Sequence, residues 1–186
     1  MKRLFDLILS VIVLIVFFFP MIVIAVFIAL TSKGPVFYFS KRVGRQNMLF
    51  NMPKFRSMKI DTPVVATHLI SEVDEHLSPI GGFLRRYSLD ELPQIFSIIK
   101  GDMSFVGPRP ALFNQYDLIE LRKNKGISDL IPGLTGWAQV NGRDEISIIE
   151  KVKLEEEYMK QKSFGFELKI LWMTVIKVVG RNGISH

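Results

Sequence analysis

Two adjacent carboxylates, Asp90 and Glu91, are the side chains in this sequence best suited to chemistry at phosphorus. A carboxylate has a reference pKa of about 4, so near neutral pH it is ionised and attacks without a general base, as in aspartyl-phosphate chemistry. Adjacent side chains on a helix diverge by about 100° and do not share one proton as a facing pair does. We therefore expect separate roles for the two carboxylates.

The segment SLDELPQIFSIIKG predicts a short helix that begins at Ser88 and is closed by Gly101. Ser88 and Glu91 have the spacing of a capping box, and such a helix start stabilises anions, including a phosphate. Acidic residues are common in any first helical turn, so the pair could also be only a charged helix start. Pro93 predicts an irregular start, because its ring and missing N–H disturb the next turn.

Basic and aromatic side chains elsewhere in the sequence are candidate ligands for a phosphorylated substrate. Arg109 lies between two prolines, whose fixed φ angles predict an extended, preorganised backbone around a planar donor. Lys54 and Arg56 add cations. PGLTGWAQVNGR supplies glycines for close backbone approach, Trp137 for stacking on a base or sugar, and Arg143. Each of these features alone is a weak signal.

Several other chemistries are excluded by motifs that the sequence lacks. It has no cysteine, which excludes disulfides, thiolate catalysis and cysteine-based metal sites. It contains no G-x-x-x-x-G-K-[ST], G-x-G-x-x-G, H-E-x-x-H or G-x-S-x-G motif. The sequence therefore gives no support for a P-loop ATPase, a Rossmann dehydrogenase, a zinc metalloprotease or a serine hydrolase.

Composition indicates a basic membrane protein with a single soluble domain. The 186 residues suffice for one modest domain, and 48% of them are hydrophobic, concentrated at the N-terminus and in the last quarter. Lys and Arg outnumber Asp and Glu by 24 to 18, a net charge of +6 that suits anionic headgroups, phosphorylated ligands or nucleic acid.

The N-terminal segment from Leu7 to Ser32 has 26 residues without a formal charge, enough for about 39 Å of helix at about 1.5 Å per residue. No cleavage site of a signal peptide follows it. Pro20 lies near its middle and predicts a kink, and each half is too short to cross a hydrocarbon core of about 30 Å. Basic residues flank both ends, which favours a re-entrant helix with both ends in the cytoplasm. A kinked single span is the alternative, and physics alone does not choose between them.

The remainder predicts an α+β domain that is mainly helical. Residues 34–44 and 47–58 read as a small β-hairpin, and residues 59–80 as a surface loop with one short helix. Further helices are expected at 112–124 and 145–162, the second with alternating Glu and Lys typical of a solvated face. An apolar helix at 164–179 is expected either at the membrane interface, as an amphipathic surface helix, or in the domain core.

Four long motifs, in order along the chain, together resemble the monotopic phosphoglycosyl transferases, also called bacterial sugar transferases. They are KFRSM at 54–58, SLDELPQ at 88–94, KGDMSFVGPRP at 100–110 and PGLTGWAQVNGR at 132–143. The match covers nearly the whole chain, whose small size resembles the minimal form of the family. One difference is that the best-known member breaks its membrane helix at Ser-Pro, where this chain has Phe19-Pro20.

The resemblance implies a re-entrant membrane helix at 1–32, broken at Pro20, and a catalytic domain at 33–186 on the cytoplasmic face of the bacterial inner membrane. It implies a magnesium ion and a ping-pong reaction through a covalent phospho-sugar enzyme. Asp90 matches the nucleophile, Glu91 the neighbouring magnesium ligand and Arg109 a phosphate-binding position. We extend substrate contact to further residues, namely Lys54, Arg56, Arg85, Trp137, Gln139 and Arg143.

The expected reaction moves a phospho-sugar from a UDP-sugar to polyprenyl (undecaprenyl) phosphate, releases UMP and initiates a surface glycoconjugate. One alternative is a membrane-associated glycosyltransferase that moves the sugar alone and releases UDP. Another is a non-enzymatic basic membrane scaffold; nucleic-acid binding is not expected, because no recognisable binding motif is present. The sequence names neither the sugar nor the pathway, and it leaves a homo-oligomer open.

Overall fold

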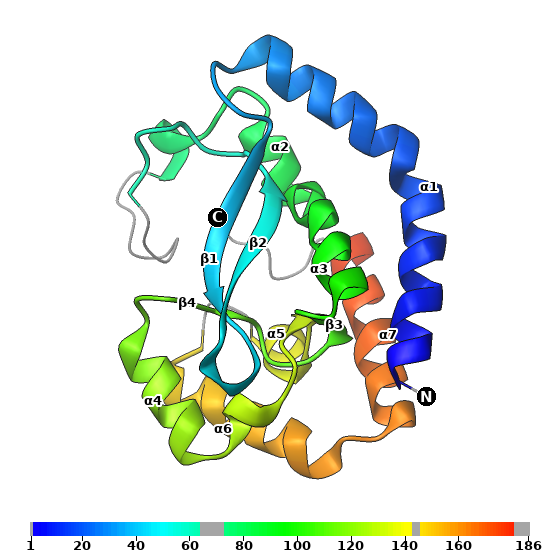
Figure 1. The fold of residues 1–186 in the computed structure, drawn as a ribbon, viewed down its shortest axis with the longest axis vertical. Helices are drawn as coiled ribbons and strands as arrows, with labels where there is room; N and C mark the ends of the chain where they lie inside the picture. The colour runs from blue at the N-terminus through cyan, green and yellow to red at the C-terminus, as the bar shows by residue number, and fades with distance from the viewer. Residues whose placement is uncertain (1, 64–72, 143–145, 181–186) are drawn as a thin grey trace.

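The computed structural model describes residues 2–63, 73–142 and 146–180 of the 186-residue chain, and Figure 1 shows their arrangement. The α-helices are α1 (Lys2–Thr31), α2 (Gly81–Arg86), α3 (Ile95–Lys100), α4 (Tyr116–Asn124), α5 (Trp137–Asn141), α6 (Ile148–Gln161) and α7 (Phe164–Gly180). Short 3₁₀ helices are η1 (Arg45–Asn47), η3 (Val73–His76), η4 (Leu89–Gln94) and η5 (Ile127–Asp129). The strands are β1 (Phe37–Val43), β2 (Leu49–Phe55), β3 (Ser104–Val106), β4 (Ala111–Leu112) and β5 (Gly133–Thr135).

The mainly helical α+β class predicted from the sequence is confirmed. The predicted hairpin is present as β1 and β2, which pair antiparallel from Phe37 opposite Phe55 to Val43 opposite Leu49. β4 extends this sheet along β1, and β3 pairs with β5 in a separate parallel pair.

The expected helix at 112–124 is α4, the one at 145–162 is α6, and the one at 164–179 is α7. α6 is only partly the solvated helix that its charges suggested, since Glu155 and Tyr158 are each 2% exposed. α7 contributes to the core through the fully buried Ile170, whereas its Trp172, Val175 and Ile176 side chains lie exposed; its placement at a membrane interface stays a prediction.

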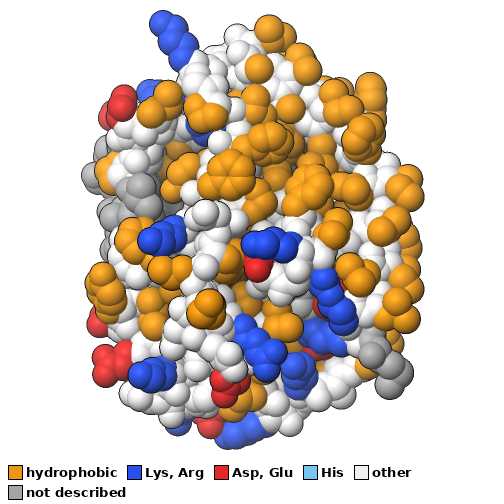
Figure 2. Space-filling model, viewed as in Figure 1, with side chains coloured by type: hydrophobic (Ala, Val, Ile, Leu, Met, Phe, Trp, Pro, Cys, Tyr) orange, Lys and Arg blue, Asp and Glu red, His pale blue; other side chains and the backbone are white. Residues whose placement is uncertain are grey.

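α1 is long and apolar enough to cross a membrane and runs along one edge of the molecule (Figure 1). Its 30 residues form one continuous helix in which Pro20 is an internal residue, so the predicted break is not an interruption of the helix. In Figure 1 the helix axis changes direction along its course. In Figure 2 hydrophobic side chains cover this edge, while most of the charged side chains visible on this face lie in its lower half.

Both ends of α1 are fastened to the rest of the chain. At its start, Lys2 donates hydrogen bonds to the carbonyl of Val106 and to the Glu167 carboxylate, while Asp6, 4% exposed, accepts from the Phe105 amide. At its end, Ile28 is fully buried in a cluster with residues from β2 and α2. The helix is therefore held at both ends by one folded body.

The glycines predicted to lie close to a substrate approach the chain's own backbone instead. A Cβ on Gly133 would lie 2.1 Å from the Gly107 amide nitrogen, and one on Gly136 would lie 2.1 Å from the Gly107 carbonyl oxygen. β3 and β5 can pair at this spacing only because the side chains are missing. These glycines therefore let the backbone of β5 pack closely against Gly107, which follows β3.

The predicted start of the Ser88 helix is wrong in one respect. Ser88 has φ +54° and ψ +24°, in the left-handed region, and its side chain caps no amide, so the capping box with Glu91 does not form. The irregular start predicted from Pro93 is confirmed, because residues 89–94 form the 3₁₀ helix η4 before α3 begins at Ile95. Gly101 ends α3 in the left-handed conformation, as predicted.

Candidate active site

Asp90 and Glu91 lie together on η4, which packs against strand β2. Asp90 is 6% exposed, and the Glu91 side chain is 12% exposed. A buried carboxylate is costly unless it is paired or shares a proton, so the surroundings of each side chain determine its charge. The two surroundings differ.

Glu91 is held by two cations from other parts of the chain. Its Oε1 atom accepts hydrogen bonds from Lys54 Nζ, on β2, and from Arg109 Nη2, each at 2.8 Å. Burial alone would raise the pKa of Glu91, but the charges of Arg109 and Lys54 outweigh it and hold this pKa well below its usual range. Glu91 is therefore ionised throughout the neutral range.

The side-chain carboxylate of Asp90 has no hydrogen-bond partner among the residues that the structure describes. Burial raises the pKa of Asp90 above its ordinary value, and the charge of Glu91 adds to this shift, whereas the Lys54 ammonium opposes it. Burial likewise lowers the pKa of Lys54, against the pull of Glu91 and Asp90. Two neighbouring carboxylates thus have pKa values shifted in opposite directions.

The two carboxyl groups line different cavities, as their expected divergence predicts. Asp90 lines a cavity of about 350 Å³ together with Lys54, Arg85 and Ser40. Arg42 and Lys59 extend its basic wall, and Tyr38 and Phe37 supply aromatic rings. Clustered cations beside a buried carboxylate suit a ligand that carries phosphate groups.

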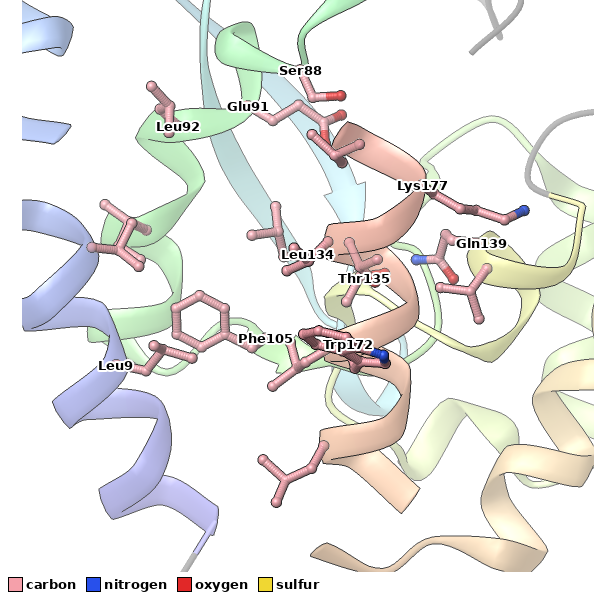
Figure 3. A pocket seen from close by; sticks show the side chains of 18 of the residues that line it. Leu9, Ser88, Glu91, Leu92, Phe105, Leu134, Thr135, Gln139, Trp172 and Lys177 are labelled. Carbon is pink, nitrogen blue, oxygen red and sulfur yellow. Dashed lines mark hydrogen bonds between the residues drawn. The ribbon is translucent and has the colours of Figure 1, made fainter. Parts of the chain in front are cut away.

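Glu91 lines a larger cavity of about 580 Å³, to which α7 contributes the most residues and α1, η4, β5 and α5 contribute others. Figure 3 shows Ser88 and Glu91 at one end of it, and Leu9, Phe105 and Trp172 at the other. Arg109, Gln139 and Lys177 complete the polar lining, and the remaining lining is almost entirely hydrophobic. Such a cavity suits an amphiphile with an anionic head and a hydrocarbon tail.

Some predicted substrate ligands lie at these cavities. Lys54 and Arg85 line the smaller cavity, and Arg109 and Gln139 line the larger one. Gln139 is notable because both polar atoms of its side-chain amide are buried without a hydrogen-bond partner among the described residues. Buried amides are normally paired, so this one is available to a ligand.

Other predicted ligands have structural partners instead. The Arg56 guanidinium lines the smaller cavity but donates to the carbonyls of Ser32 and Lys33, where it caps the end of α1. Trp137 donates from Nε1 to Glu157 and packs on Phe166, with ring centroids 5.0 Å apart, away from both cavities. Arg143 lies outside the described residues.

Three cations at the cavities were missed by sequence reasoning: Arg42, Lys59 and Lys177. Arg42 lies on the hairpin strand β1, and Lys177 on an apolar helix that was considered only as a membrane or core element. Motif spacing carries no signal for them, because the fold alone brings these segments to η4.

A divalent cation fits Glu91 only together with a substrate. Among the described residues there is no group of three or more acidic or histidine side chains that could enclose a metal. Magnesium commonly uses one or two carboxylates and completes its shell with substrate phosphates and water. Glu91 is a hard oxygen ligand of this kind, and among the described residues no hydrogen bond is made to its Oε2 atom.

Comparison with known proteins gives a consistent result. The family model for bacterial sugar transferase matches residues 1–181. The chain is 38% identical over 186 residues to the uncharacterized sugar transferase EpsL of Bacillus subtilis, covering all of this chain and 91% of that protein. It is 38% identical to the UDP-glucose:undecaprenyl-phosphate glucose-1-phosphate transferase of Escherichia coli, covering 95% of this chain and 40% of that protein.

The undecaprenyl-phosphate galactose phosphotransferase of Salmonella typhimurium is 32% identical, covering 98% of this chain and 41% of that protein. The chain therefore spans less than half the length of these two named transferases. The match of the family model over almost every residue, together with these relatives, shows that this chain belongs to the bacterial sugar transferase family.

Proposed function

We propose that this chain transfers a phospho-sugar from a UDP-sugar to polyprenyl phosphate through a covalent intermediate on Asp90. The observation that carries the proposal is the meeting of two unlike cavities at one dipeptide, basic at Asp90 and amphipathic at Glu91. A reaction between a water-soluble nucleotide sugar and a lipid phosphate needs such a meeting point. The name of the Escherichia coli relative, which includes UDP-glucose and undecaprenyl phosphate, agrees with this substrate pair, and the name of the Salmonella relative agrees with the lipid acceptor.

In the first step, an Asp90 carboxylate oxygen attacks the β-phosphorus of the UDP-sugar. A bond forms between that oxygen and phosphorus, and the bond from phosphorus to the bridging oxygen breaks, so that UMP leaves with the electron pair. Lys54 and Arg85, which line the same cavity as Asp90, bind the phosphate oxygens and offset the repulsion between anions.

In the second step, a phosphate oxygen of the polyprenyl phosphate attacks the phosphorus of the adduct, and the Asp90 carboxylate leaves as an anion. Asp90 and the polyprenyl phosphate both react as anions, so neither attack transfers a proton to a general base. Arg109, which lies beside Glu91, and Gln139, which also lines the larger cavity, bind the lipid phosphate, and the apolar side chains of α1 and α7 receive the prenyl chain.

Glu91 is the proposed magnesium ligand. The ion, when bound there with substrate phosphates, supplies charge neutralisation of the transferring phosphoryl group and of the UMP leaving group. Lys54 and Arg109 keep the Glu91 side chain ionised and fix its position beside Asp90.

We also propose that α1 enters the cytoplasmic leaflet of the inner membrane and leaves from the same side, with the domain from residue 33 onward on the cytoplasmic face. Support comes from the anchoring of both helix ends: Lys2 bonds to Val106 and Glu167, and Arg56 bonds to Ser32. If α1 crossed the bilayer, one of its ends would lie on the opposite side from this domain. The hydrophobic side chains exposed along α1 also support its contact with lipid.

The deciding experiment is incubation of the purified protein with a panel of UDP-sugars and Mg²⁺, followed by intact-protein mass spectrometry. A mass increase equal to one phospho-sugar, absent in Asp90→Asn, supports the covalent mechanism. Release of UMP rather than UDP on addition of polyprenyl phosphate separates the proposal from a glycosyltransferase that moves the sugar alone. Equal turnover by the parent and Asp90→Asn would show that the mechanism is wrong.

A further inference from the structure

The backbone on either side of Arg109 is held almost entirely through its carbonyl groups. Pro108 and Pro110 have no amide N–H, so Arg109 supplies the single donor of this tripeptide. All three carbonyls, in contrast, accept hydrogen bonds. Pro108 O accepts from the Gly133 amide at 2.9 Å, Arg109 O from Arg122 Nη2 at 2.9 Å, and Pro110 O from Arg42 Nη1 at 3.1 Å.

The donor to Arg109 O belongs to a buried ion pair. Arg122 on α4 is 8% exposed and Glu155 on α6 is 2% exposed. Arg122 Nε donates to Glu155 Oε2 at 2.7 Å, and Arg122 Nη2 donates to Glu155 Oε1. The second bond uses the same Nη2 nitrogen that reaches Arg109 O, so Glu155 fixes the guanidinium plane and thereby the direction of the bond to Arg109.

A buried ion pair gives little net stability, because desolvation of both charges offsets their attraction. Stability alone is therefore a weak reason for this pair. Its position is informative: it lies directly behind the residue whose side chain holds Glu91 at 2.8 Å. A chain of contacts thus runs from α6 through α4 and Arg109 to the carboxylate beside Asp90.

We infer that Arg122 and Glu155 are positioning residues that fix the backbone of Arg109 and, through it, the guanidinium that binds Glu91 and substrate phosphate. Neither residue lines the two cavities, so neither touches substrate there. The expected effect on turnover rests on the proposed function, whereas the contacts that fix Arg109 do not depend on it.

The test compares Arg122→Lys with a matched control, Lys160→Gln, which breaks an exposed pair with Glu156 on the same helix as Glu155. A lysine at 122 keeps the positive charge opposite Glu155, but it has no planar guanidinium to donate hydrogen bonds to Glu155 and to the Arg109 carbonyl at the same time. We expect kcat to fall about tenfold to a hundredfold in Arg122→Lys, the scale of a small misplacement of a catalytic group, and to stay at the parental value in the control.

A double-mutant cycle separates positioning from general structural damage. If Arg122 acts through Arg109, Arg122→Lys should cause no further loss of activity in a protein that already carries Arg109→Gln. If Arg122 is only structural, Arg122→Lys should lower activity by the same factor in the parent and in Arg109→Gln. Arg122→Met combined with Glu155→Met provides a second variant, which removes the pair without leaving a buried unpaired charge. Parental activity in Arg122→Lys, or equal losses in both backgrounds, would overturn the inference.

Hydrogen exchange gives a readout that does not need turnover. Peptides covering residues 107–112 should exchange faster in Arg122→Lys than in the parent, and at the parental rate in Lys160→Gln. A parent that forms no adduct with any UDP-sugar would refute the proposed function and leave this measurement valid. Unchanged exchange at 107–112 in Arg122→Lys would refute the positioning role, whatever the reaction is.

Discussion

Arg56 is the residue for which the motif and the structure disagree most clearly about role. The motif KFRSM predicts a substrate ligand, whereas the structure shows its guanidinium donating to Lys33 O at 2.7 Å, Ser32 O at 3.0 Å and Ser32 Oγ at 3.1 Å. Arg56 is 5% exposed, so these contacts form inside the protein, between the end of α1 and the end of β2. Arg56→Met keeps the aliphatic stem and removes all three bonds.

The expected cost of Arg56→Met follows from these contacts. Hydrogen bonds to a charged group contribute about 1.5–3 kcal/mol each, and water can replace part of them here because Ser32 and Lys33 are not buried. We therefore expect a loss of about 3 kcal/mol, which for a chain of this size lowers Tm by roughly 6–12 °C. The KM for the UDP-sugar should stay within about twofold of the parental value.

Thermal unfolding in detergent and steady-state kinetics measure the two effects. Lys54→Met, two residues earlier, is the matched comparison, because it also exchanges a cation for an unbranched apolar side chain. It should lower kcat, since Lys54 lies at the site beside Glu91. An Arg56→Met protein with an unchanged Tm and a KM raised tenfold or more would show that Arg56 binds substrate and that the structural role is wrong.

Two further predictions concern the separate cavities. The Lys54 ammonium opposes the rise of the Asp90 pKa, so Lys54→Met should raise this pKa further. The acid limb of the kcat/KM profile should then move to higher pH in Lys54→Met and stay in place in Lys54→Arg. A shift to lower pH in Lys54→Met would contradict this electrostatic account. Trp172→Ser in the larger cavity should raise the KM for polyprenyl phosphate several-fold and leave the rate of adduct formation on Asp90 unchanged. The control is Ile149→Ser, which changes an exposed apolar side chain on α6. Slower adduct formation in Trp172→Ser would contradict the assignment of this cavity to the acceptor.

Local patterns predicted much of the fold, because their signals are encoded within a few residues. The hairpin follows from alternation around a turn, and the end of α3 follows from Gly101. The capping box at Ser88 failed because Pro93 and the packing of η4 on β2 favour a tighter 3₁₀ turn. Tertiary contacts override a local capping preference of about 1 kcal/mol.

The site was predictable where residue chemistry alone limits the role. Lys54 and Arg109, expected as substrate ligands, come from separate motifs, and the structure brings both to Glu91. Trp137 shows the limit of such reasoning, because its type predicts stacking but not the partner, which is Phe166. Glu155 was hidden for a related reason, since a glutamate among lysines on a helix reads as solvated until the fold buries it.

The electrostatics of the dipeptide agree with the two proposed roles. Glu91, with a pKa held down by Arg109 and Lys54, is a weak base and a stable anion, which suits a residue that binds cations. Asp90 is buried without a hydrogen-bond partner among the described residues, and its raised pKa marks a more basic carboxylate with less stabilisation of its charge. Since nucleophilic strength rises with basicity, the direction of these shifts supports the proposal that Asp90 is the nucleophile. Exchange of the pair, Asp90→Glu with Glu91→Asp, should therefore abolish adduct formation even though both carboxylates remain.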